Sequence, residues 1–268
     1  MAVGGYSGTV LTSEDGITWT LRTSVASNGV YGLAYGNNTF LGVGSSGSIL
    51  TSSDGISWTT QTSGTSTTLR GATFGNSLFV AFGGSGIYTS SDGTSWISRT
   101  SGTGNQLRGS TYGNSTFIVV GYSGTILTSS DGSTWTSRTS GTSEVLSGVT
   151  YGNSTFVTVG HGDTVLTSSD GTTWTSRTSG NNQGFNAITY GNNTFVAIGG
   201  GGTIYTSSDG TTWTSKTSGL SSVNGITYGN SLFVVVGGSG KIITSADGTT
   251  WTSRTSGTSN DLDEVTPR

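Results

Sequence analysis

The chain has 268 residues, of which 47 are Gly, one is Pro and none is Cys, so disulfide frameworks and thiolate chemistry are excluded. Ten basic residues against 13 acidic ones give a net charge of −3, which argues against nucleic-acid binding, since that needs Lys and Arg to displace phosphate counterions. No apolar run approaches the ~20 residues that span a bilayer, and the N-terminus lacks a signal peptide, so no membrane association is expected and the compartment stays open.

A tryptophan recurs every 38 or 39 residues along the whole chain. The seven copies are Trp19, Trp58, Trp96, Trp135, Trp174, Trp213 and Trp251. A period near 40 made of strands and turns is typical of the blades of a β-propeller.

The repeat that contains Trp174 reads as four short strands rich in β-branched residues, separated by Gly, Asn and Asp turns. The strands are expected at residues 146–151, 155–160, 164–168 and 173–177. No apolar period of 3.6 residues persists in the chain, so no helix is expected.

These repeats predict an all-β fold, a single seven-bladed β-propeller over residues 1–268 with four-stranded antiparallel blades. A β-solenoid with two coils per repeat is the alternative, and the hairpin turns favour the propeller. The Tyr/Phe-Gly-Asn turn occurs six times, whereas the strand that follows it occurs seven times. The last blade is therefore expected to join residues 261–266 to residues 2–24, which pairs both free edges. Glu264 replaces the Gly or Ala of the other repeats, and Pro267 and Arg268 are expected to form a frayed tail.

An Asp precedes Gly in a tight turn before each tryptophan. These residues are Asp15, Asp54, Asp92, Asp131, Asp170, Asp209 and Asp247. An Asp in such a turn accepts hydrogen bonds from the backbone N–H groups that follow it, so we expect a structural role without metal or cofactor.

The segment from Ser168 to Trp174 (SSDGTTW) resembles an Asp-box (BNR) repeat of sialidase-like and photosystem II assembly-factor-like propellers. Every copy here has one residue fewer between Asp and Trp than the usual box. The resemblance covers nearly the whole chain and implies the fold, whereas it does not imply an activity, because one fold hosts many functions.

Strand alternation places the Asp-Gly and Tyr/Phe-Gly-Asn turns at one face of the disc and the more variable turns at the other. The variable connections include residues 25–27. Twelve residues after most tryptophans, one position is expected to ring the mouth of the central channel. These positions are Tyr31, Arg70, Arg108, Ser147, Asn186, Asn224 and Asp263.

Arg70 and Arg108 come from adjacent repeats, and their two guanidinium groups together suit a carboxylate or sulfate, although both also fit plain solvated charges. Tyr6 and Tyr122 are candidates for stacking on sugar rings. His161, two residues from Asp163, is a candidate base, and an idle exposed His is the simpler interpretation.

A non-catalytic binding or scaffold module for a protein surface is the favoured function, acting as a monomer because seven blades close the ring. A lectin-like propeller that binds a glycan and a ligand-free amplified or engineered propeller are the alternatives. A glycosidase needs two carboxylates across a cleft, whereas Asp261, Asp263 and Glu264 crowd together near the C-terminus, so we expect no enzyme.

Overall fold

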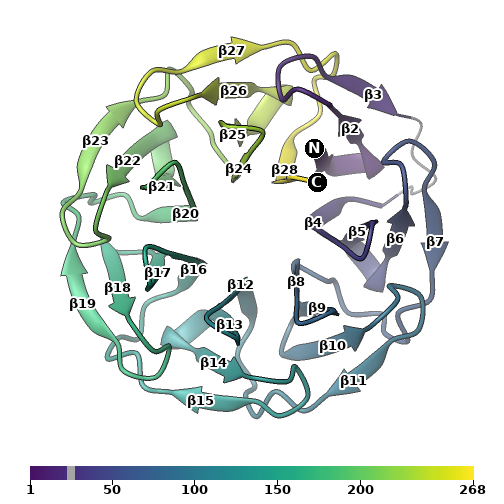
Figure 1. The fold of residues 1–268 in the computed structure, drawn as a ribbon, viewed down its shortest axis with the longest axis horizontal. Helices are drawn as coiled ribbons and strands as arrows, with labels where there is room; N and C mark the ends of the chain where they lie inside the picture. Colours follow the sequence, from purple (N-terminus) through teal and green to yellow (C-terminus); the bar gives the residue numbers. More distant parts are fainter. Residues whose placement is uncertain (23–27) are drawn as a thin grey trace.

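The computed structural model describes residues 1–22 and 28–268. Seven four-stranded antiparallel sheets stand in a ring around a central channel, so the chain is a seven-bladed β-propeller as predicted (Figure 1). The predicted variable connection at residues 25–27 lies outside the described residues, as do the last two residues of the predicted 2–24 segment.

Each blade has its innermost strand first in its repeat and its outermost strand last (Figure 1). Blade 1 comprises β4 (Val30–Gly36), β5 (Thr39–Gly44), β6 (Ile49–Ser52) and β7 (Thr59–Gln61). Blade 2 comprises β8 (Gly71–Gly75), β9 (Leu78–Gly83), β10 (Gly86–Ser90) and β11 (Ile97–Arg99). Blade 3 comprises β12 (Leu107–Gly113), β13 (Thr116–Gly121), β14 (Ile126–Ser129) and β15 (Thr136–Arg138). Blade 4 comprises β16 (Leu146–Gly152), β17 (Thr155–Gly160), β18 (Thr164–Ser168) and β19 (Thr175–Thr178). Blade 5 comprises β20 (Phe185–Gly191), β21 (Thr194–Gly199), β22 (Thr203–Ser207) and β23 (Thr214–Thr217). Blade 6 comprises β24 (Gly225–Gly229), β25 (Leu232–Val236), β26 (Ile242–Ser245) and β27 (Thr252–Arg254).

The seventh blade joins the two ends of the chain. Its strand order is β28 (Leu262–Thr266), β1 (Ala2–Gly5), β2 (Val10–Thr12) and β3 (Thr20–Arg22), with Ala2 opposite Thr266 and Val3 opposite Val265. The predicted closure by N- and C-terminal strands is confirmed, and it leaves neither end of the chain as an unpaired edge.

The expectation of a frayed tail is wrong for Pro267. A Cβ on Gly229 would lie 2.5 Å from Pro267 Cβ, so the proline covers this glycine as an aromatic ring does in the other blades. Arg268 Nε donates to the Tyr35 hydroxyl of blade 1 at 3.3 Å, so even the last residue contacts the neighbouring blade.

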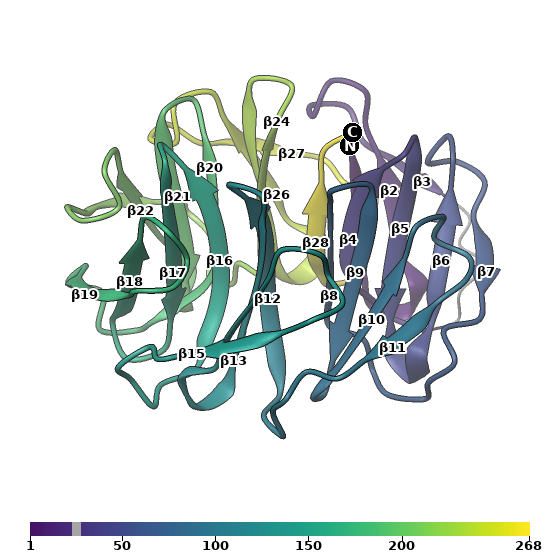
Figure 2. The ribbon, with the colours of Figure 1, turned by 60° about the horizontal axis from the view of Figure 1, so that its bottom comes forward.

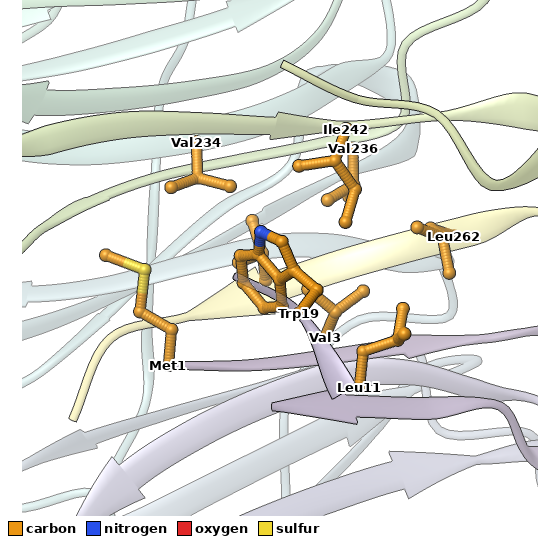
Figure 3. Packing of buried hydrophobic residues seen from close by; sticks show 9 residues of the cluster. Met1, Val3, Leu11, Trp19, Val234, Val236, Ile242 and Leu262 are labelled. Carbon is orange, nitrogen blue, oxygen red and sulfur yellow. The ribbon is translucent and has the colours of Figure 1, made fainter. Parts of the chain in front are cut away.

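The hydrophobic core lies between blades. Alternate residues of each second strand face opposite neighbours: Phe117 and Val119 pack against blade 2, whereas Ile118 and Val120 pack against blade 4. Figure 3 shows the closing interface, where Trp19 of blade 7 lies among side chains that include Val236 of blade 6. Each fully buried Phe contributes roughly 2–3 kcal/mol of hydrophobic stabilisation. Among the described residues, the closing interface has no Phe and is held by Trp19 with Met, Val, Leu and Ile side chains instead.

Two local details differ from the sequence prediction. The outer strand of blade 4 begins at Thr175 rather than Thr173, because the backbone N–H groups of Thr172 and Thr173 are bound to Asp170 and are committed to the turn. Five short 3₁₀ turns follow second strands: η1 (Tyr6–Gly8), η2 (Ser45–Gly47), η3 (Tyr122–Gly124), η4 (Gly200–Gly202) and η5 (Gly238–Gly240). The central residue of each has positive φ, a conformation that Gly201 adopts without strain and that Ser adopts in the other four turns.

Candidate functional site

Each Asp-Gly turn is closed by its own hydrogen bonds. In blade 4, Asp170 Oδ1 accepts from the backbone N–H groups of Thr172 and Thr173 at 2.8 and 3.0 Å, and from Ser168 Oγ. Ser168 Oγ also accepts from Gly171 N–H at 2.8 Å. The Thr172 hydroxyl and these N–H groups stabilise the ionised form, which lowers the pKa of Asp170. The carboxylate of Asp170 is therefore occupied by hydrogen bonds of its own turn, as are those of the other Asp-Gly turns.

The tryptophan and the basic residue of each repeat complete this arrangement. Six of the seven indole Nε1 groups donate to the Gly carbonyl of their own turn at 3.0–3.2 Å, and Trp251 is the exception. Arg177 Nε donates to Thr167 Oγ1 at 3.0 Å, and Gln61 makes the same bond to Thr51. The repeated Arg therefore bridges the two outer strands of its blade, and an amide can replace it.

Figure 2 shows the loops between strands gathered at the two faces of the disc. Side chains of the face that carries these turns, here called the turn face, also bond neighbouring blades to each other. The Asn230 amide of blade 6 donates to the Glu14 carbonyl of blade 7 at 2.7 Å, and Asn192 reaches Ala246 in the same way. A Cβ on Gly152 would lie 2.0 Å from Cγ of Tyr190, and the rings of Phe74, Tyr112, Tyr151 and Tyr228 cover the glycines of their preceding blades in the same way. The repeated residues of the turn face are thus accounted for by structure.

The opposite face, here called the variable face, opens into the central channel. The channel holds a cavity of about 490 Å³ that is lined by the innermost strands of all seven blades. The predicted ring meets there. Its members are Tyr31, Arg70, Arg108, Ser147, Asn186, Asn224 and Asp263, here called the mouth ring.

A β-bulge presents mouth-ring residues to the channel. In blade 3, Leu107 pairs with Gly121 and Gly109 pairs with Val120, so Arg108 is an extra residue without a partner. The same shift occurs at Tyr31, Ser147, Asn186 and Asp263. A bulge bends its strand and re-aims a side chain, which is why such residues recur beside binding sites.

The two arginines of the mouth ring each lie over a tyrosine. Arg70 Cζ is 5.7 Å from the Tyr31 ring centroid, and Arg108 Cζ is 5.7 Å from that of Tyr122. Tyr31 is itself fixed, because its hydroxyl accepts from Ser45 Oγ at 3.0 Å and its ring meets Tyr6 edge to face at 5.9 Å. A cation over an aromatic face is held in place, and Arg108 Nη1 also donates to the Tyr122 hydroxyl at 3.5 Å, so the remaining guanidinium N–H groups are the ones available to a ligand.

Blade 7 gives the same cavity an acidic side. Loss of solvating water raises the pKa of Asp263 to about 7, an effect that nearby Asp261 reinforces and Arg70 opposes. The same loss of water raises the pKa of Glu264 to about 8, although Val265 N–H donates to Glu264 Oε1 at 3.1 Å. A channel with cationic and anionic walls can orient a ligand that carries charge.

His161 and Asp163 do not form a pair. His161 is exposed, whereas the Asp163 carboxylate accepts hydrogen bonds from the backbone N–H groups of Ser179, Gly180 and Asn181 and from the Ser179 hydroxyl. Asp163 therefore fixes the connection that leaves blade 4. Tyr6 is 51% exposed at the rim, where its neighbour is Tyr31 rather than Tyr122.

Two features of the cavity were missed in the sequence. Ser147 is 6% exposed and its Oγ has no hydrogen-bond partner, and Asp263 Oδ2 is likewise buried without one. Glu264 stands where the other repeats have Gly or Ala, and this departure is the one signal in the sequence that blade 7 differs in chemistry.

Within residues 1–22 and 28–268, no three His, Cys, Asp or Glu side chains gather as metal ligands, and no helix is long and apolar enough to cross a membrane.

No protein-family model and no curated protein matches the chain. Solved structures do resemble its propeller. YCF48 bound to a D1 peptide is 18% identical with a TM-score of 0.66, over 84% of this chain and 81% of that one. The computationally designed Ika8 protein is 13% identical with a TM-score of 0.65, over 92% and 81%. A chain of a nidogen–laminin complex is 15% identical with a TM-score of 0.57, over 76% and 88%. At these identities the likeness concerns the fold alone.

Proposed function

We propose that this propeller is a non-catalytic binding module that holds an acidic segment of a partner protein at the mouth of its channel. One observation carries the proposal: positions that vary between otherwise repeated blades converge on a single cavity, where Arg70 and Arg108 present their guanidinium groups. Paired guanidinium groups bind carboxylates with charge-assisted hydrogen bonds. The occurrence of YCF48 with a D1 peptide, and of nidogen with laminin, supports a polypeptide ligand.

The arrangement of acids favours binding over glycoside hydrolysis. Hydrolysis needs two carboxylates on opposite sides of the scissile bond, and both carboxyl groups that line this cavity, Asp263 and Glu264, come from the single strand β28. The seven Asp-Gly turns lie at the other face and are held by their own backbone. Catalysis therefore has no set of residues that fills its roles.

The experiment is a binding screen of peptides rich in Asp and Glu, with and without the double substitution Arg70→Ala/Arg108→Ala. Lys241→Ala is the matched control, because Lys241 is an exposed cation that follows the turn η5 and does not line the cavity. We expect the double variant to lose binding and the control to keep it. Equal binding by the double variant, or no binding of any acidic peptide, would overturn the proposal.

A lectin-like function is the second candidate, and the exposure of Tyr6 favours it, because an exposed aromatic ring stacks on the C–H face of a sugar. The same screen with neutral and acidic glycans separates the two. Glycan binding that is lost in Tyr6→Ala and kept in Arg70→Ala/Arg108→Ala would place a sugar site on the rim instead.

A further inference from the structure

The opposite charges of the channel mouth do not neutralise one another. Arg70 and Asp263 line one cavity and lie in blades 2 and 7, separated by Tyr31 of blade 1. Their charges interact, since Arg70 lowers the pKa of Asp263, yet no carboxylate of the described residues comes within 4.0 Å of either guanidinium of the mouth ring. The cavity therefore keeps its cationic side apart from the Asp263 side, which becomes anionic as Asp263 ionises.

Buried polar groups that line the same cavity also lack partners. Four buried side-chain polar atoms in the described part of the chain have no hydrogen-bond partner, and two of them, Ser147 Oγ and Asp263 Oδ2, belong to the mouth ring. Ser147 follows Arg108 around the ring, so its hydroxyl extends the cationic side as a further donor. An unsatisfied buried polar group is costly, which favours a ligand that supplies the missing bonds.

The remaining members of the mouth ring are already committed. The Asn186 amide donates to the Val223 carbonyl at 2.8 Å, and the Asn224 amide donates to the Leu262 carbonyl at 2.9 Å. Tyr31 is occupied with Ser45, Tyr6 and Arg70. The groups free to bind are thus the two guanidinium groups and Ser147 on one side, and Asp263 with Glu264 on the other.

We propose that the channel mouth recognises a partner segment in which an acidic side chain stands beside a basic one, with the acid at Arg70 and Arg108 and the base at Asp263. This inference rests on the proposed function and adds the second charge and its position. A segment with acidic groups alone satisfies the arginines and leaves Asp263 unpaired. A segment of both signs satisfies both walls in one orientation, which gives specificity as well as affinity.

The recognition depends on pH in a defined direction. The charged groups that face Asp263 are Asp261 and Glu264 of its own segment and Arg70 across Tyr31. Asp263 ionises near pH 7, so its attraction for a basic side chain strengthens between pH 6 and pH 8.5. The arginines stay charged throughout this range, and their hold on the acidic side chain does not change.

The test compares three end-blocked synthetic peptides with Glu-Gly-Lys, Glu-Gly-Gln or Gln-Gly-Lys at the centre of one neutral sequence, titrated against the full chain at pH 8. We expect the mixed peptide to bind about tenfold more tightly than the acidic one, the equivalent of one additional charge-assisted hydrogen bond. In Asp263→Asn this preference should vanish, while the acidic peptide binds as before. Glu144→Gln, which removes an exposed acid outside the cavity, should keep the preference.

The two proposals fail differently. Equal affinity for the mixed and acidic peptides in the unaltered protein, or a preference that survives Asp263→Asn, would overturn the mixed-charge inference and leave acidic-segment binding intact. If Asp263→Asn loses all binding, a thermal melt of this variant and of Asp263→Ser shows whether they are folded. A folded variant that no longer binds the acidic peptide would contradict the assignment of the acidic side chain to Arg70 and Arg108. Absence of binding by both Glu-containing peptides would overturn the proposed function itself.

Discussion

Asp170 and Asp263 are the same side chain at opposite faces of one disc, and the fold shifts their pKa values in opposite directions. The turn around Asp170 supplies N–H and hydroxyl donors, which lower the pKa of its carboxyl group. The channel around Asp263 removes water without supplying a partner for Oδ2, which raises its pKa to about 7. The turn face uses its carboxylates to hold the fold, whereas the Asp263 carboxyl group at the channel mouth has an oxygen that no donor of the fold satisfies.

The largest expected effect concerns Glu264. Its folded-state pKa of about 8 lies well above that of an unfolded Glu, so the folded state binds the extra proton and the free energy of unfolding falls as pH rises from 5 to 9. Allowing for water in the channel, the loss is about 2–4 kcal/mol. In Glu264→Gln the thermal midpoint should lose about half of its fall over that pH range, as measured by melts, because Asp263, whose pKa is raised to about 7, contributes a similar share. An unchanged slope in the variant would show that Glu264 is solvated.

The second effect tests the turn face. In Gly152→Ala the new methyl group would meet the Tyr190 ring 2.0 Å from Cγ, and overpacking of this kind costs about 1–3 kcal/mol. Gly104→Ala is the matched control, because a Cβ there meets nothing within 4 Å and the backbone φ is not left-handed. Chemical denaturation should show a loss for Gly152→Ala only. Equal midpoints for the two variants would mean that the rings do not hold the blades together.

The blades, their closure and the mouth ring could be predicted from the sequence because each depends on a local pattern of residues. The spacing of tryptophans indicated the blades, the count of turns against strands indicated the closure, and an offset of twelve residues from most tryptophans, eleven from Trp213, identified the mouth ring. The bulges that turn Arg108 and Asp263 into the channel could not be predicted, because they arise from pairing with a second strand. The raised pKa values of Asp263 and Glu264 could not be predicted either, because they depend on the exclusion of water from a channel that all seven blades form.

A smaller effect concerns stability at low pH, where the aspartates of the turn face become protonated. The pKa of Asp170 is lowered on folding, so its contribution to stability is complete above the unfolded value near 4 and is lost as pH falls below it. The other six aspartates of the Asp-Gly turns behave alike, and stability should drop between pH 4 and pH 2. In Asp170→Asn the drop should be shallower than in the unaltered chain, measured by urea unfolding at both pH values. An identical drop would mean that the turn does not discriminate between the charged and the neutral side chain.

The smallest expected effect is the one that separates the two faces most sharply. Arg70 is exposed and Arg108 half-buried, and neither makes an ion pair with a described carboxylate, so Arg70→Ala and Arg108→Ala should each change the free energy of unfolding by no more than about 0.5 kcal/mol. Arg177→Ala is the contrast, because it removes the bond to Thr167 Oγ1 that joins two strands, and it should cost about 0.5–1.5 kcal/mol. Urea unfolding of the three variants distinguishes Arg177, whose hydrogen bond stabilises the fold, from Arg70 and Arg108, whose removal should leave the free energy of unfolding nearly unchanged. If Arg70→Ala or Arg108→Ala destabilised the chain as much as Arg177→Ala, the guanidinium groups of the mouth ring would be structural, and the case for a binding site at the channel mouth would lose its main support.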